Sequence, residues 1–232
     1  MNFWLHIFVL CLPLVYCSTV RNVHLIDPIP YMIKLITETM IRMEDEGWWN
    51  LKIPDVSEDV NVEVVEEIIN GTVWFKNGFV VSIRQVAIVQ HTLGQVWRYN
   101  SAENTTTVEI TGTMRMNDVT LGFDVEASLT NGVQHYTSEI VLPEIAYDMR
   151  VIRDMFTDRI DVSITPSFSR TITNRMKILP ATNVADIFAS LFVLDFVAPG
   201  VNSWTSEFLH PFAKDLVENV LVYPTICYDC PA

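Results

Sequence analysis

The spacing of hydrophobic positions changes twice along this chain and divides it into three parts. In the first part, apolar residues recur every three or four positions from Ile29 to Met43, as on one face of a helix. Asp27-Pro28 is a favoured helix start, with Asp27 as the N-cap residue, and Gly47 is a favoured end. The pattern predicts an amphipathic helix between these two signals.

From about Val60 to Pro180 the spacing changes to two. Apolar residues alternate with polar ones from 107 to 116, again from 119 to 130, and later from 160 to 164. This alternation is typical of strands that have one buried and one solvated face. The middle of the chain is therefore predicted as an antiparallel meander with a single apolar face.

Three dipeptides have the composition of hairpin turns: Asn77-Gly78, Asn117-Asp118 and Asn131-Gly132. Read as two-residue turns, the second pairs Met116 with Val119 and the third pairs Leu129 with Gln134. Both pairings place the same apolar residues of the middle strand on one face, and a slip of one residue would invert that face. We therefore expect a reversal of the chain at each of the three sites.

After Pro180 the helical spacing returns, from Ile187 to Phe196 and from Trp204 to Tyr223. Ala198-Pro199-Gly200 separates the two runs, and His210-Pro211 predicts a kink in the second. The apolar stretch 187–197 is too short to span a bilayer, so we expect no stable membrane insertion. A helix, a sheet and a long broken helix indicate an α+β fold, with the helices on the apolar face of the sheet.

The first seventeen residues carry no acidic or basic side chain. Their apolar run is shorter than the roughly 20 residues that a membrane-spanning helix needs. Val15 and Cys17 occupy the positions that a signal peptidase reads. Residues 1–17 are therefore predicted to be a removed signal peptide, with a retained anchor as the alternative. We expect a secreted, extracellular protein in which residues 18–232 form one domain.

The charge of the chain bears on its partners. There are 28 acidic and 15 basic residues, which gives a net charge of −13. Such a chain has no electrostatic footprint for nucleic acid and is repelled by anionic membranes. Binding of a neutral or apolar molecule is not opposed by this charge. We expect no nucleic-acid partner, and the sequence leaves open whether the protein forms a dimer.

Cys227 and Cys230 are the two cysteines outside the predicted signal peptide. Their CxxC spacing also occurs in redox sites and in halves of zinc sites. The pair lies at the end of the sequence, however, and no second Cys pair or His cluster completes a zinc site. A small disulfide between Cys227 and Cys230 is the favoured interpretation for a secreted chain.

Two N-glycosylation sequons agree with secretion. They begin at Asn70 and Asn104, and both adjoin turn residues. We expect both asparagines to lie on the surface.

Motifs for catalysis are missing from the sequence. It contains no GxSxG, HExxH, phosphate-binding-loop or GxGxxG pattern. His24, His91, His135 and His210 are scattered without metal spacing, and no carboxylate pair stands out. We expect no catalytic residues, no metal, no cofactor and no enzyme activity. A hydrolase site assembled only by the fold is the remaining alternative.

Three short stretches carry a resemblance to a known family. They are Asp27-Pro28-Ile29, Lys52-Ile53-Pro54-Asp55 and residues 209–216. Together with the order of elements, they resemble the mite group 7 allergens, which are similar in architecture to insect juvenile-hormone-binding and takeout proteins and to the bactericidal/permeability-increasing protein fold. The N-terminal Cys pair of juvenile-hormone-binding proteins is absent here, which favours the group 7 branch.

The resemblance implies a super-roll: a curved antiparallel sheet wrapped around a long helix, with a second, kinked C-terminal helix and an elongated apolar cavity for a lipid-like molecule. The basic surface of endotoxin-binding relatives has no counterpart in a chain at −13. Lipopolysaccharide is therefore a disfavoured ligand.

An apolar cavity of this kind is lined by aliphatic, methionine and aromatic side chains. Such residues occur on both helical segments and on the sheet, and ordinary core packing is the alternative for each one. The candidate ligand-binding residues are Ile33, Ile36, Met40, Phe123, Val125, Phe188, Phe192 and Phe196.

The predicted function is that of a secreted, non-enzymatic binding protein for a lipid-like or other apolar ligand. The alternative is an interaction or innate-immunity module with a closed, fully packed core. Such a module would meet a protein partner through the Trp48-Trp49 loop or an acidic face.

Overall fold

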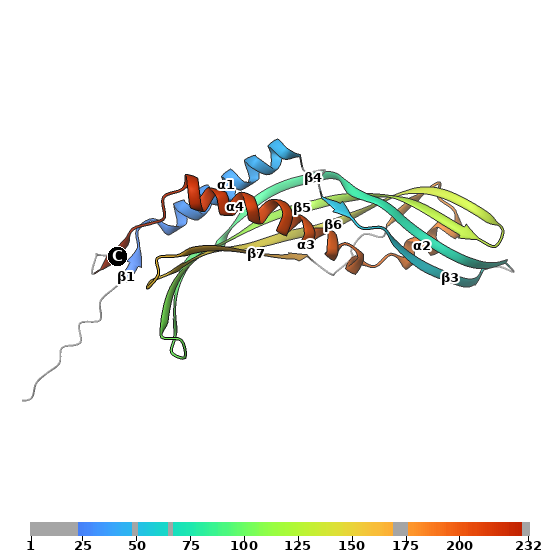
Figure 1. The fold of residues 1–232 in the computed structure, drawn as a ribbon. Helices are drawn as coiled ribbons and strands as arrows, with labels where there is room; N and C mark the ends of the chain where they lie inside the picture. Colours follow the sequence, from blue (N-terminus) through green and yellow to red (C-terminus); the bar gives the residue numbers. More distant parts are fainter. Residues whose placement is uncertain (1–22, 48–50, 65–66, 169–175, 229–232) are drawn as a thin grey trace, which may run out of the picture.

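The computed structural model describes residues 23–47, 51–64, 67–168 and 176–228. The predicted signal peptide, the Trp48-Trp49 loop and Cys230 lie outside these residues. The described chain has an α+β fold, as expected, with helices lying along a long, curved antiparallel sheet (Figure 1).

Three long strands form the centre of the sheet: β4 (Glu67–Asn100), β5 (Thr105–Leu129) and β6 (Gly132–Asp154). Shorter strands pair with the free edges of β4 and β6. They are β2 (Lys52–Ile53) and β3 (Val56–Val64) on β4, and β7 (Ile160–Phe168) and β8 (Lys177–Leu179) on β6. A separate ribbon pairs β1 (Val23–Leu25) with β9 (Ile226–Tyr228).

The predicted hairpin at Asn117-Asp118 is wrong, because β5 runs straight through it. Asp118 does adopt a left-handed backbone, with φ 48. The apolar alternation changes phase at this level in all three central strands. The pairing is continuous across it, from Ile83 to Val86 on β4, although β4 and β5 shift register just before it, between Val80 and Ser82. The phase changes lie at Ile83/Val86, Met116/Val119 and Leu142/Ile145. A phase change within one strand and a two-residue turn between two strands both shift the apolar alternation by one position, so the sequence pattern is the same for both.

The predicted hairpin at Asn77-Gly78 is also wrong. The pairing between β4 and β5 shifts register between Lys76 and Phe79, and Asn77 has φ 54. A β-bulge therefore occupies the site where a turn was expected.

The third predicted turn is confirmed as a hairpin between β5 and β6. Leu129 pairs with Gly132 rather than with Gln134. Since this register differs from the predicted one by two residues, the same side chains still face the interior.

Helix α1 (Pro28–Glu46) begins and ends where the sequence predicted. Asp27 does not cap it, however, because its backbone is left-handed and its side chain makes no cap hydrogen bond. The buried face is also rotated from the predicted stripe, since Ile29 is 43% exposed. The buried residues of this helix are Tyr31, Met32, Leu35, Ile36, Thr39 and Met43.

Past β8 the chain forms helix α2 (Asn183–Leu191) and a short turn, η2 (Leu194–Phe196). A long helical segment follows: α3 (Ala198–Trp204), η3 (Thr205–Leu209), α4 (His210–Asp215) and η4 (Leu216–Val220). The break predicted at Ala198-Pro199-Gly200 lies before α3 instead. Pro199 stands at the start of that helix, where its missing N–H is not needed. Pro211 follows the π-helical turn η3, in agreement with the predicted kink.

No single helix among the described residues is both long and apolar enough to cross a membrane. Residues 183–191 and 194–220 would meet that criterion only together, and they are bent by 62° relative to each other.

An ion pair joins the first helix to the last. Arg42 Nη1 lies 2.6 Å from Asp215 Oδ2, and Asn219 Nδ2 donates to Asp215 Oδ1 at 2.7 Å. The hydrogen bond from Arg42, followed by that from Asn219, holds the pKa of Asp215 below its ordinary value.

Asp215→Asn is therefore expected to lower stability at neutral pH and to have no effect in acid. Because the folded pKa is lowered, the stabilising effect is complete above the unfolded pKa, about 3.9, and disappears as pH falls through the folded value. Urea unfolding of both proteins between neutral pH and about pH 2.5 measures this. A stability difference that persists in acid would contradict the ion-pair explanation.

Candidate functional site

The interior lies between the helices and one face of the sheet. Helix α1 and the long C-terminal helical segment cover one half of this face, and α2 with η2 covers the other (Figure 1). The buried apolar side chains of both halves belong to a single cluster. A ligand held inside the protein would therefore have to lie in this apolar layer.

The structure divides the predicted ligand-binding residues into two groups. On α1, Ile36 is buried, while Ile33 and Met40 are half-buried. The second group lies around α2 and η2, at the opposite end of the sheet (Figure 1). It consists of Phe123, Val125, Phe188 and Phe192, which are buried, and Phe196, which is half-buried.

The second group forms an aromatic cluster around Phe192. Its ring centroid lies 5.1 Å from Phe123, 5.2 Å from Phe75 and 5.5 Å from Phe196. Phe188 packs on Tyr136 at 5.8 Å. These centroid distances are those of aromatic rings in contact, so the rings themselves fill much of the space between α2 and the sheet.

Sequence reasoning missed Phe75, which is fully buried in this cluster. Phe75 lies two positions before the bulge at Asn77. The hairpin predicted at Asn77-Gly78 placed Phe75 at the end of a strand, where burial is not expected. The alternation of Val73 and Phe75 was the signal that could have found it, since both are buried on the inner face.

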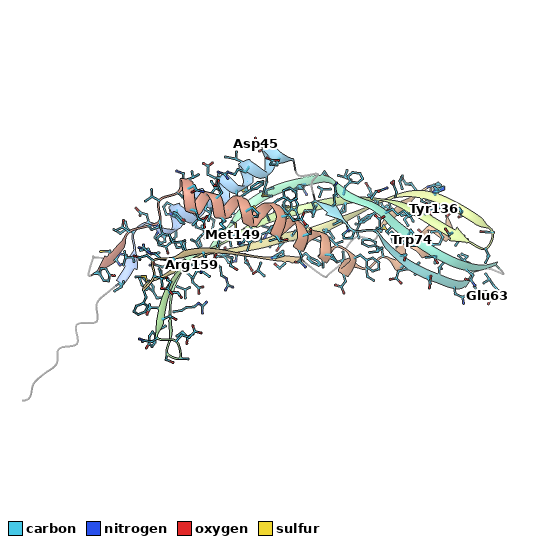
Figure 2. All side chains as sticks on the ribbon, in the orientation of Figure 1. Asp45, Glu63, Trp74, Tyr136, Met149 and Arg159 are labelled. Carbon is cyan, nitrogen blue, oxygen red and sulfur yellow. The ribbon has the colours of Figure 1, made fainter. Side chains whose placement is uncertain are left out.

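Methionine side chains gather where α1 lies against the sheet. Gly112 on β5 makes the approach possible: a Cβ atom there would lie 2.6 Å from Met32 Cγ and 3.1 Å from Ile36 Cδ1. Met149 pairs with Gly112 on the neighbouring strand, and Met114 is the next inward-facing residue of β5. Figure 2 labels Met149 in the part of the sheet that lies by the C-terminal helix.

Several polar atoms in this interior have no hydrogen-bond partner among the described residues. They are the hydroxyl groups of Tyr31, Tyr147 and Tyr223, the indole nitrogen of Trp97 and the Nε atom of Arg153. Burial raises the pKa of Tyr31 to about 12 and raises those of Tyr147 and Tyr223 further. All three hydroxyls therefore keep their protons at neutral pH.

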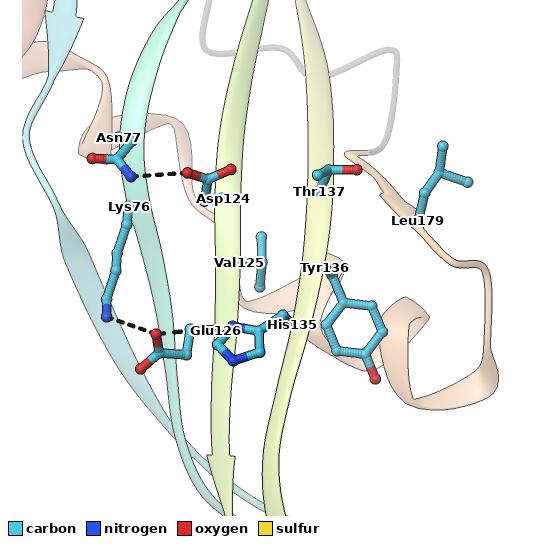
Figure 3. Close-up of a pocket in the computed structure, with 9 residues that line it drawn as sticks. All are labelled: Lys76, Asn77, Asp124, Val125, Glu126, His135, Tyr136, Thr137 and Leu179. Carbon is cyan, nitrogen blue, oxygen red and sulfur yellow. Dashed lines mark hydrogen bonds and ion pairs between the residues drawn. The ribbon is translucent and has the colours of Figure 1, made fainter.

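A hollow of about 410 Å³ opens on the outer face of β4, β5 and β6 (Figure 3). Its charged groups are paired across the strands: Lys76 Nζ lies 3.0 Å from Glu126, and Asn77 Nδ2 donates to Asp124 at 2.8 Å. His135 Nδ1 lies 4.0 Å from the same Glu126. Lys76 with Glu126 and Asn77 with Asp124 thus form cross-strand pairs, as expected for a solvated sheet face.

The remaining predicted sites lie on the surface or at the chain end. Asn70 and Asn104 are both exposed, as the sequons require. Cys227 is in a disulfide bond, and its predicted partner Cys230 lies outside the described residues. Across the described ranges, no group of three or more His, Cys, Asp or Glu side chains is placed to hold a metal ion.

Taken together, these features define a class: an α+β protein with a curved antiparallel sheet, whose inner face is apolar and covered by helices. No family model and no curated protein matches the sequence. Among solved structures, the chain is similar to the crystal structure of lipopolysaccharide binding protein, with 8% sequence identity and a TM-score of 0.45. The match covers 83% of this chain and 41% of that chain, so the present chain spans less than half of that protein. The comparisons give no support to the more particular resemblance to mite group 7 allergens.

Proposed function

We propose that this chain is a secreted, non-enzymatic binding protein for a lipid-like apolar ligand, held between the helices and the sheet. The observation that carries the proposal is the methionine-rich contact between α1 and the sheet. Met32 lies against Gly112 there, Met149 pairs with Gly112 on the neighbouring strand, and Met114 is buried two positions further along β5.

Methionine suits this role because its side chain is unbranched, flexible and polarisable. Such residues repack around ligands of different shape more readily than branched aliphatic residues do. An interior of this kind can be filled in the free protein and still admit a ligand by rearrangement. Burial of the ligand would supply about 25 cal/mol for each Å² of apolar area, before the ordering costs.

The aromatic cluster around Phe192 offers a second apolar region at the far end of the same layer. The super-roll architecture implied by the sequence resemblance has its ligand in this position, between helix and sheet. We accordingly propose that this chain also has the super-roll architecture. The net charge of −13 favours a neutral or weakly charged ligand over lipopolysaccharide.

A second candidate function is an interaction module with a permanently closed interior. One observation favours it: an apolar groove of about 210 Å³ on the outer face of the sheet. Phe79, Val81 and Leu179 line this groove and are 47%, 54% and 61% exposed. Gly122 forms part of its floor, next to the ring of Phe79. Exposed apolar patches of this kind often bind proteins.

Titration with the fluorescent apolar probe 1-N-phenylnaphthylamine distinguishes the two candidates. Full-length protein is expected to bind the probe with micromolar affinity, and a neutral lipid such as monoolein is expected to displace it. Met149→Gln, which places an amide in the apolar layer, is expected to weaken binding about tenfold or more. The half-buried Phe196→Ser provides a second interior variant if Met149→Gln does not fold.

The matched control is Phe79→Ser, which alters only the outer groove. It is expected to leave the affinity for the probe unchanged. Loss of binding in Phe79→Ser, together with unchanged binding in both interior variants, would reject an internal site and favour the interaction module.

A further inference from the structure

We infer that Tyr31, Tyr223 and Arg153 form a recognition site for the carboxylate of a fatty acid at one end of the inner face. This inference rests on the proposed function. It specifies the chemical class of the ligand and which end of the inner face binds its polar head group.

Three segments far apart in the sequence bring these side chains together. Tyr31 lies in the first turns of α1, Arg153 near the end of β6, and Tyr223 just after η4. The two tyrosine rings lie 5.7 Å apart, and the Arg153 guanidinium lies 5.2 Å from the Tyr223 ring. In Figure 1 the start of α1 and the end of the C-terminal helical segment lie at the same end of the molecule, beside β1.

All three side chains have an unused hydrogen-bonding atom. Neither tyrosine hydroxyl nor Arg153 Nε has a partner in the described part of the chain, and each atom is shielded from solvent. Tyr31 is only 8% exposed. A buried polar atom without a partner is costly, so several within one cluster require an explanation.

The chemistry of the cluster selects an oxygen acceptor. Arg153 Nε–H can only donate. The tyrosines are protonated at neutral pH, and burial raises their pKa further above it. The guanidinium of Arg153 is always charged. Asp158, whose side chain is 74% exposed, forms an ion pair with its Nη2 atom. Trp97, which pairs with Val108 from the other side, adds a donor that also has no partner within the described ranges. A carboxylate is the acceptor that best matches two hydroxyls and a guanidinium.

The inner face also provides a place for the apolar chain of such a ligand. Met149 faces the interior four residues before Arg153 on β6, which is about 13 Å along a strand. Tyr31 adjoins Met32, which packs over Gly112 opposite Met149. A ligand held at the cluster would therefore extend its chain into the methionine-rich contact described above.

Competition between two amphiphiles of equal length tests the inference. Laurate and dodecyltrimethylammonium are each used to displace 1-N-phenylnaphthylamine from the full-length protein, below their micellar concentrations. Laurate is expected to bind at least about tenfold more tightly, because hydrogen bonds to charged groups contribute more than neutral ones. The double variant Tyr31→Phe/Tyr223→Phe is expected to abolish this preference.

Tyr147→Phe is the matched control, since its hydroxyl is also buried and has no partner among the described residues, while its ring packs on Trp204. It is expected to keep the preference for laurate. Without ligand, the double variant is expected to unfold at the same temperature as the unmodified protein or higher, because the hydroxyls have no hydrogen-bond partner to lose among the residues that the structure describes. A lower unfolding temperature would assign them a structural role and overturn the inference.

Equal binding of both amphiphiles, unchanged in the double variant, would overturn the carboxylate site while leaving the proposed function intact. Failure of the full-length protein to bind the fluorescent probe or either amphiphile would overturn both.

Discussion

Replacing Phe192 with alanine is expected to lower the free energy of unfolding by about 3–5 kcal/mol. Phe192 is 5% exposed, and its ring contacts Phe75, Phe123 and Phe196. Its loss removes apolar burial and three aromatic contacts at once, and leaves a cavity between η2 and the sheet. Urea unfolding followed by circular dichroism measures the change.

Phe156→Ala is the control for this variant. Phe156 lies in the turn between β6 and β7 and is 66% exposed, so its removal is expected to change stability by less than about 0.5 kcal/mol. A destabilisation below about 1 kcal/mol in Phe192→Ala would show that the aromatic cluster is loosely packed, and would contradict the geometry described here.

Gly71→Ala is expected to destabilise the protein by about 3 kcal/mol or more, through the backbone rather than the core. Gly71 has φ +156 and pairs with Leu129 on β5. A Cβ atom at this position would lie 2.1 Å from the carbonyl oxygen of Ser128, so β4 and β5 would have to separate locally. Thermal and urea unfolding both report the effect.

Gly94→Ala provides a matched control on the same strand. A Cβ atom there would meet only Thr111 Oγ1, at 4.0 Å. Its expected effect on stability is within about 0.5 kcal/mol, or slightly favourable because alanine restricts the unfolded chain. Equal losses in both variants would refute the close contact between Gly71 and β5.

Local sequence signals predicted the elements whose form is decided locally. The proline at the start of α1 and the glycine after it were sufficient to give its bounds. Strict alternation predicted β7 over residues 160–164, and the Asn131-Gly132 signal located the β5–β6 hairpin. In each case, backbone preference and the apolar pattern favour the same structure.

Long-range pairing decided the features that were missed. Asn77 and Asp118 favour the left-handed backbone, which serves a bulge or bend as well as a turn. Only the neighbouring strands determine which one forms, and their pairing is not visible in a local pattern. For this reason β4 and β5 were divided into shorter strands, and Phe75 was not assigned to the interior.

The sequence predicted which apolar residues lie in the interior, but not how they are arranged there. All eight candidate residues are buried or half-buried, yet they belong to two ends of the interior. Tyr31 and Arg153 were not predicted, because a polar atom without a partner can be recognised only when its surroundings are known. The hypothesis of a ligand-binding interior consequently rests both on residues predicted from the sequence and on residues recognised only in the structure.

Native mass spectrometry of the protein isolated from its natural source tests the central claim most directly. If the interior binds a lipid-like ligand, gently ionised protein should carry added mass that organic extraction removes and identifies as one class of apolar molecule. Protein that is free of extractable lipid, and that takes up none when incubated with neutral lipids and fatty acids, would contradict the claim.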